Sequence, residues 1–291
     1  GSWIADATDV SGTLAKIDIQ GPNSLKILYD LVKDPENVFD LMHYFSFKGS
    51  FDQTTAPFSR LQTDLPGVCL KDGTPVLISR SGYTGELGFE IFINGKNALK
   101  AWEDLVAAGQ PYGITACGLG ARDSLRAGAC LPLSHQDIGD WPFINHPWMF
   151  ALPFSKDKKS FTKSFIGDSA LLNAIDSYYT YPFAGDSLRK IGTGEKTRVI
   201  DDKGHHIGIV LTCATDMALT WHDSRIVSVN TPDLPENTKF KGISCGFVRV
   251  NCKLSNGTQL KLEEGKRQID VTIVKDIRPD RTARKKLDLF I

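Results

Sequence analysis

The sequence predicts an α+β domain followed by an all-β domain. Strands and helices are interspersed in the first half of the chain, whereas short strands separated by turns follow residue 198. The chain has 291 residues, of which 41% are hydrophobic, and at about 150 residues per domain this length suggests two domains with cores of their own. We place the boundary near residues 183–194 and divide the chain into domains 1–185 and 186–291.

The first domain opens with an amphipathic strand. Residues 13–19 alternate between the two faces, with Lys16 and Asp18 on the polar one. Apolar residues then recur at helical spacing over 25–32, with Pro35 just past the expected end. The other expected elements are strands over 75–80 and 88–93 and helices over 99–106 and 117–127. This mixture is typical of an α+β domain.

The second domain is expected to consist of strands. Turn sequences lie at 202–204 (Asp-Lys-Gly) and 255–257 (Ser-Asn-Gly), between β-rich stretches. The expected strands cover 198–201, 207–212, 243–250, 259–262 and 268–274.

The composition excludes several classes of protein. The 34 basic and 34 acidic residues cancel, which argues against a nucleic-acid partner because phosphate binding requires clustered Lys and Arg. No window approaches the roughly 18 uninterrupted apolar residues of a membrane span, and the first residues lack the features of a leader peptide, so we expect a cytoplasmic protein. The six cysteines show no metal-binding spacing. We therefore expect buried, reduced thiols and no metal.

The loop over residues 81–90, SGYTGELGFE, is the most unusual stretch. Its three glycines allow a sharp turn or a close approach to a ligand, and Tyr83, Glu86 and Glu90 supply polar groups beside them. A tight hairpin with exposed carboxylates is the alternative. A phosphate-binding loop is excluded, because neither GKS nor GKT follows.

Glu90 lies inside the expected strand, between Phe89 and Ile91. A carboxylate there is costly to bury unless it accepts hydrogen bonds. Arg122 is one candidate donor, which would form a structural ion pair. A ligand with two adjacent N–H groups is the functional alternative, since a carboxylate accepts both at once.

Two weaker patterns lie between residues 134 and 150. Ser134, His135 and Asp137 suggest a catalytic triad, but proximity in sequence does not establish a relay. Trp141 and Trp148 belong to an aromatic run that is either core packing or a stacking wall for a planar ligand.

Two long motifs carry a resemblance to a known family. They are residues 81–91 and residues 118–126 (GLGARDSLR), supported by 17–22 (IDIQGP) and by the segment 204–274. The chain resembles the glycine cleavage system T-protein, or aminomethyltransferase, and its tetrahydrofolate-dependent methyltransferase relatives. The resemblance implies a folate-binding α+β domain, incomplete at its N-terminus, followed by a C-terminal β-barrel domain.

The resemblance also implies a cofactor site and a reaction. Glu90 would hold the pterin amino group and ring N–H, with Arg122 nearby. A one-carbon unit would pass from a small-molecule or carrier-bound donor to N5 of tetrahydrofolate, mainly through positioning and electrostatics, with no catalytic residue assigned. We also expect Tyr83, Glu86, Arg126 and Trp148 to bind the cofactor.

Departures from the family pattern define the alternatives. The chain starts almost at the first strand, so the family's aspartate beside the reacting centre has no counterpart; we expect an N-terminal segment removed or supplied by a partner subunit. Gly128 replaces a family glutamate, and Arg281 and Arg284 lie where a tyrosine is expected. The alternative function is a non-catalytic folate-binding or assembly subunit. The folate domain of an amine oxidase is a third option, and it would require a separate flavin protein.

Overall fold

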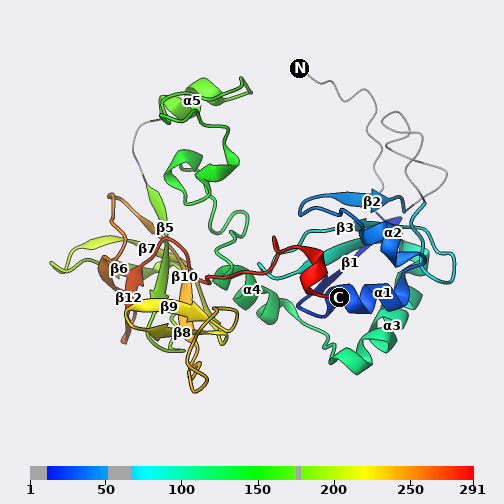
Figure 1. The fold of residues 1–291 in the computed structure, drawn as a ribbon. Helices are drawn as coiled ribbons and strands as arrows, with labels where there is room; N and C mark the ends of the chain where they lie inside the picture. The colour runs from blue at the N-terminus through cyan, green and yellow to red at the C-terminus, as the bar shows by residue number, and fades with distance from the viewer. Residues whose placement is uncertain (1–11, 52–66, 175–177) are drawn as a thin grey trace. The chain divides into compact units, whose positions relative to one another are not determined.

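The computed structural model describes residues 12–51, 67–174 and 178–291 (Figure 1). The chain divides into two compact units. Unit 1 comprises Gly1–Cys117 together with Arg281–Ile291, and unit 2 comprises Gly118–Asp280.

Unit 1 is built on an antiparallel sheet with the strand order β1-β4-β3-β2. The strands are β1 (Leu14–Gln20), β2 (Phe47–Gly49), β3 (Val76–Ser79) and β4 (Gly88–Asn94), and the helices are α1 (Ser24–Leu31), α2 (Pro35–Phe39) and α3 (Ala98–Gly109). The 3₁₀ helices of this unit are Gly95–Asn97, Gln110–Tyr112 and Leu287–Leu289.

The alternation along β1 and β4 gives the sheet one buried and one open face. Ile17, Phe89 and Ile91 are nearly inaccessible to solvent and pack with Leu25 and Leu28 of α1 in one core. Figure 1 shows α1 and α3 together on one side of these strands. The polar residues of β1 and β4 consequently lie on the opposite face.

The predicted elements of unit 1 are confirmed with small shifts at their ends. Pro35 lies past the end of α1, as expected, and it also begins α2, which the sequence pattern did not predict. Its fixed φ and missing N–H suit the first turn of a helix, where the N–H groups have no intrahelical acceptor.

Unit 2 contains a closed antiparallel barrel with the strand order β10-β5-β12-β11-β6-β7, so the predicted all-β region is confirmed as a barrel. The barrel strands are β5 (Tyr179–Gly185), β6 (Gly194–Ile200), β7 (His206–Asp216), β10 (Ile243–Val250), β11 (Gln259–Glu264) and β12 (Arg267–Ile273). The unit also contains α4 (Leu119–Gly128), α5 (Asp168–Leu172), a hairpin of β8 (Leu219–His222) and β9 (Arg225–Ser228), and 3₁₀ helices at Phe143–Asn145 and Met149–Ala151.

The structure divides the chain at a different place from the predicted boundary between residues 185 and 186. Strand β5 precedes that boundary but pairs with β10 and β12 in the barrel. Helix α4 also belongs to unit 2, where Arg126 donates a hydrogen bond to Thr212 of β7 at 2.9 Å. Residues 281–291, expected in the barrel domain, return to unit 1, where Thr282 accepts the N–H of Leu87 at 2.8 Å. These long-range contacts cannot be inferred from local periodicity.

The cysteines agree only in part with the expected buried thiols. All six are free, and Cys213 and Cys245 are buried, which raises the pKa of both thiols. Cys117 is exposed, so the expectation is wrong for this residue.

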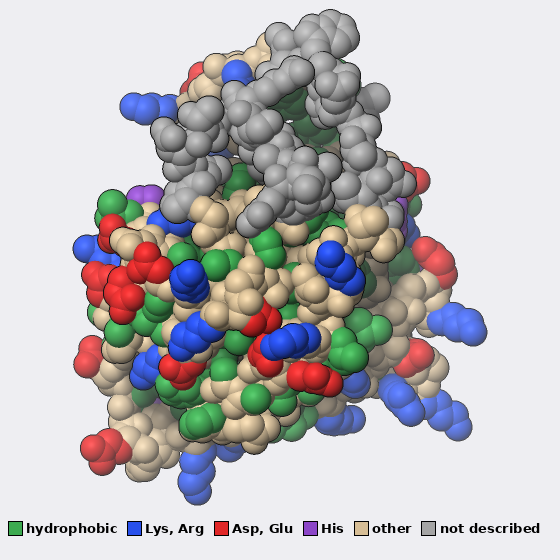
Figure 2. All heavy atoms as spheres, turned by 90° about the vertical axis from the view of Figure 1, so that its right-hand side faces the viewer, with side chains coloured by type: hydrophobic (Ala, Val, Ile, Leu, Met, Phe, Trp, Pro, Cys, Tyr) green, Lys and Arg blue, Asp and Glu red, His purple; other side chains and the backbone are tan. Residues whose placement is uncertain are grey.

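Two observations bear on the expected partners. The face turned to the viewer in Figure 2 carries basic and acidic side chains interspersed, which differs from the one-sided basic surface typical of nucleic-acid binding. Among the helices of the described residues, none is both long enough and apolar enough to cross a membrane.

Candidate functional site

Glu90 lies at the centre of the open face of the unit 1 sheet. The antiparallel registers place it opposite Asp18 of β1 on one side and Ser79 of β3 on the other. The Glu90 side chain is 21% exposed to solvent. The carboxylate is therefore half-buried and accessible from the open face.

Both carboxylate oxygens of Glu90 have donors within unit 1. Lys16 Nζ donates to Oε1 at 2.5 Å, and Ser81 Oγ donates to Oε2. Lys16 also contacts Asp18 at 3.3 Å. Two acidic side chains and one basic side chain thus form a small network, which satisfies the need for donors inferred from the sequence.

The network keeps Glu90 ionised at neutral pH. Burial opposes ionisation, but the hydrogen bonds from Lys16 and Ser81 lower the pKa of Glu90 overall. Burial raises the pKa of Asp18, against the opposing charge of Lys16. For Lys16, burial is outweighed by the two carboxylates, and its pKa is raised.

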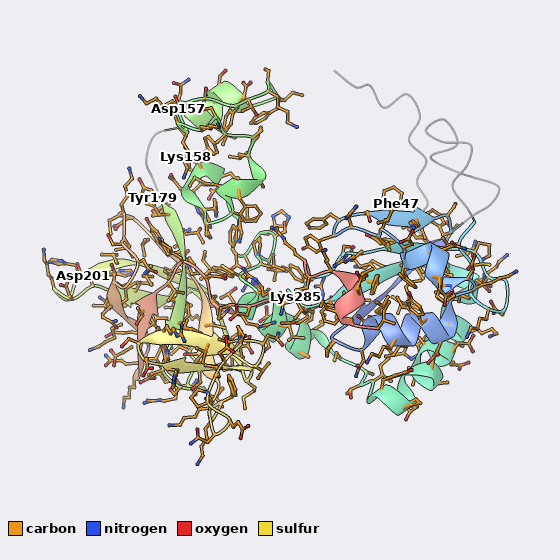
Figure 3. All side chains as sticks on the ribbon, in the orientation of Figure 1. Phe47, Asp157, Lys158, Tyr179, Asp201 and Lys285 are labelled. Carbon is orange, nitrogen blue, oxygen red and sulfur yellow. The ribbon has the colours of Figure 1, made fainter. Side chains whose placement is uncertain are left out.

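Apolar side chains surround this network on the same face. Phe92 lies opposite Lys16 and Leu77 in the register, and both Phe92 and Leu77 are half-buried. Phe47 lies opposite Ser79 on the edge strand β2 and is 44% exposed (Figure 3). A charged acceptor flanked by half-exposed rings is suited to a planar ligand that carries N–H donors.

The glycines of the 81–90 loop accommodate a side chain of the protein. A Cβ atom at Gly82 or at Gly88 would lie 2.1 Å from Oε1 of Gln20. The Gln20 amide donates to the Ser81 carbonyl at 3.2 Å and accepts from Thr84 at 3.0 Å. Close approach is therefore required at Gly82 and Gly88, and the group that approaches is the Gln20 amide.

Two further predicted site residues lie on this loop, and one of them binds the C-terminal segment. Thr282 donates to the Glu86 carboxylate at 2.5 Å, and the Ala283 N–H donates to the Gly85 carbonyl at 3.1 Å. These contacts favour a structural role for Glu86 over cofactor binding. Tyr83 is half-buried on the same loop.

The other predicted site residues belong to unit 2. Arg122 is exposed on α4, and the partners observed for Glu90 are instead Lys16 and Ser81. Arg126 is 1% exposed and binds Asp123, the buried Asp137 and Thr212. Its engaged guanidinium favours a structural role over the predicted contact with the cofactor.

The suggested triad is not supported. The Asp137 carboxylate is bound to Arg126, to the Thr212 hydroxyl at 2.7 Å and to the Leu133 N–H at 2.8 Å. His135 is exposed. The aspartate is therefore committed to the buried interior of unit 2 rather than to orienting a histidine.

The aromatic run supports the packing alternative. Trp148 is 4% exposed, donates to the Cys130 carbonyl at 2.8 Å and meets Phe247 edge-on at 5.2 Å. Trp141 is 8% exposed in the same cluster. Both rings lie in the core of unit 2, which favours packing over the predicted cofactor contact of Trp148.

Gly128, which replaces the family glutamate, lies against a buried ion pair. Arg278 and Asp216 are both almost fully buried and meet at 2.8 Å. A Cβ atom at Gly128 would lie 2.0 Å from Asp216 Oδ2 and 2.7 Å from Arg278 Nη2. The pair leaves no room for a side chain at this position.

Unit 2 also has a cavity of about 800 Å³ whose lining includes Trp141, Glu195 and Arg249. None of the six predicted site residues lines it. Within residues 12–51, 67–174 and 178–291, no group of three or more His, Cys, Asp or Glu side chains is arranged to hold a metal ion.

The local sequence did not reveal Lys16 as a partner of Glu90. The two residues are 74 positions apart, and only the pairing register of β1 with β4 brings them together. The predicted polar face of the first strand was the available signal, since it identified Lys16 and Asp18 as neighbours of whatever strand pairs there.

Fold and site together define a class of protein: an α+β unit that presents a hydrogen-bonded carboxylate on an open sheet face, joined to a closed antiparallel barrel. Comparisons with known proteins agree. Residues 4–142 match the GCVT N-terminal domain. Over this region the chain belongs to the glycine cleavage T-protein family.

The relatives are named aminomethyltransferases. One from Alkaliphilus metalliredigens is 31% identical over 212 residues, which cover 72% of this chain and 50% of the relative. One from Bacillus cereus is 39% identical over 166 residues, which cover 55% of this chain and 39% of the relative. The chain thus spans half or less of the length of these curated relatives.

A solved structure shares the fold. The crystal structure of glycine cleavage system aminomethyltransferase T from Bartonella henselae superposes with a TM-score of 0.60 at 21% identity. The match covers 94% of this chain and 61% of that protein. It confirms the predicted fold class, an α+β domain with a C-terminal β-barrel.

Proposed function

We propose that this chain binds tetrahydrofolate on the open face of the unit 1 sheet and takes part in transfer of an aminomethyl or methyl group to N5 of the cofactor. The observation that carries the proposal is the half-buried, ionised Glu90 carboxylate, which faces an accessible sheet surface. A pterin offers an N–H and an amino group side by side, and a carboxylate accepts from both at once.

The surroundings of Glu90 fit the cofactor. Phe92, Leu77 and Phe47 supply apolar surface on the same face, against which the flat ring system can pack. Transfer to N5 requires no protein nucleophile, so the protein's contribution is to orient the cofactor and the donor.

The donor and any partner chain belong to the same proposal. Because the curated relatives are aminomethyltransferases, we propose an aminomethyl donor bound to a carrier, with a small methyl donor as the other possibility. The carrier would be the partner of this chain in the reaction.

Calorimetric titration of tetrahydrofolate into the chain tests the proposal. The wild-type chain should bind, and Glu90→Ala should weaken binding by about 2 kcal/mol, a roughly 30-fold rise in Kd, because a charge-assisted hydrogen bond is lost. Glu103→Ala, which removes an exposed carboxylate from α3 of the same unit, is the matched control and should bind like the wild type. Equal affinity of the Glu90 and Glu103 variants would refute the assignment.

A further inference from the structure

Glu90 and its neighbours form an ordered row of hydrogen-bonding atoms. Lys16 Nζ lies 2.5 Å from Oε1, and Ser81 donates to Oε2. An ammonium group has three donors, and the two oxygens of a carboxylate have about four acceptor positions. After these contacts are made, Lys16 still has a donor for a ligand and both oxygens of Glu90 can still accept. A ligand therefore meets one donor, from Lys16, followed by two acceptors, from Glu90.

We propose that Lys16 and Glu90 together recognise a 2-amino-4-oxo heterocyclic edge, and that Lys16 is the residue that selects the 4-oxo group. This inference rests on the proposed function and deepens it. The edge of the pterin ring presents a carbonyl oxygen at C4, an N–H at N3 and an amino group at C2, in that order. An acceptor followed by two donors is the complement of the row in the protein.

The row also determines the orientation of the ring. The C4 oxygen would face Lys16 on β1, and the 2-amino group would lie toward Ser81, which follows β3 in the chain. Asp18 contacts Lys16 from the side of its own strand at 3.3 Å. This second contact holds the ammonium beside Oε1 rather than leaving it to sample solvent.

The inference predicts discrimination against a close analogue. In 4-amino-4-deoxytetrahydrofolate the C4 oxygen is replaced by an amino group and N3 carries no proton. The analogue therefore presents donors to the donors of Lys16 and lacks the N3–H that a Glu90 oxygen would accept. A site built around a hydrogen bond disfavours an analogue that cannot form it. We expect the wild-type chain to bind this analogue at least tenfold more weakly than tetrahydrofolate.

Calorimetric titration of both compounds into the wild type and Lys16→Met tests the inference. The variant should bind tetrahydrofolate about tenfold more weakly and the 4-amino analogue no more weakly than the wild type does, so that the preference for the 4-oxo compound falls at least tenfold. The part of the preference that Glu90 exerts at N3 should remain. Lys96→Met, which removes an exposed lysine from the same unit, should retain the wild-type preference.

A second pair of variants controls for the charges left behind. Without Lys16, Asp18 and Glu90 repel each other, so Asp18→Asn should be compared with the double variant Lys16→Met/Asp18→Asn. The preference for the 4-oxo compound should be at least tenfold smaller in the double variant than in Asp18→Asn.

The two possible failures are distinguishable. A preference for the 4-oxo compound that is unchanged in Lys16→Met would overturn the role of Lys16 and leave the proposed function standing. Absence of tetrahydrofolate binding to the folded wild type would overturn the proposed function and this inference with it.

Discussion

His146 provides a quantitative test of how unit 2 is packed. The side chain is 2% exposed, and its ring stacks between Trp141 at 5.2 Å and Trp148 at 5.5 Å. Within the described part of the chain, neither ring nitrogen meets the geometry of a hydrogen bond. Burial lowers the pKa of His146 from 6.5 to about 4, with the backbone of Trp141 partly opposing the shift.

The direction of the pH dependence follows from this shift. Between pH 4 and 6.5 the unfolded chain binds a proton at His146 that the folded chain does not, so the free energy of unfolding falls as the pH is lowered through this window. At about 1.4 kcal/mol per unit, His146 accounts for roughly 3 kcal/mol of stability lost between about pH 7.5 and pH 4.

Replacement of His146 by Phe should remove this contribution. The phenyl ring keeps the stacking with both tryptophans and removes two buried nitrogens, so stability near pH 7.5 should be unchanged or higher. Urea unfolding followed by tryptophan fluorescence at both pH values gives the comparison. The difference in the free energy of unfolding between the wild type and the variant should change by roughly 3 kcal/mol between the two pH values. The other titrating groups are common to both proteins and therefore cancel in this difference.

An exposed histidine of the same unit supplies the control. His206→Gln should keep the pH dependence of the wild type, since His206 lies at the surface of β7. Parallel pH profiles for the wild type and His146→Phe would show that His146 is protonated equally in the folded and unfolded chains, which would refute the packing argument.

Two further predictions concern buried ion pairs of unit 2. Gly128→Ala should destabilise the unit by about 3 kcal/mol, because the added Cβ displaces one partner of the Arg278–Asp216 pair; a thermal melt within 1 °C of the wild type would contradict this. Asp137→Asn should cost about 3 kcal/mol in urea unfolding, since it removes the buried carboxylate of the two that bind Arg126 and leaves only the half-exposed Asp123 to balance its charge. A loss below about 0.5 kcal/mol, as is usual for surface substitutions, would show that the pair is not needed.

Local periodicity was sufficient where an element buries one face regularly. The first strand, the first helix and most barrel strands were predicted from alternation or helical spacing, because each buries a regular stripe of apolar residues. Strand β5 was missed because Pro182 lies within it, and proline normally counts against a strand. The strand forms because β10 and β12 pair with its two edges in the closed barrel.

The candidate site was also predictable only in part from the sequence. That Glu90 needs donors follows from its position between Phe89 and Ile91 in a half-buried strand, and no structure is required to infer it. The identity of the donors does not follow, because Lys16 comes from a distant strand whose register is set by the whole sheet. Arg122 was a reasonable candidate in sequence, and the contact observed is with Lys16 instead.

By itself, the sequence determined the type and order of most elements, the need of Glu90 for hydrogen-bond donors and, through two motifs, the family. Only the tertiary structure decided where the units divide and which residues donate hydrogen bonds to Glu90. It also showed that Gly82 makes room for Gln20 and that Gly128 makes room for the Asp216–Arg278 pair. The physical reason is the range of the interactions. Helical and strand periodicities act over a few residues, whereas ion pairs and close packing join residues far apart in the chain, and their partners are chosen only when the fold closes.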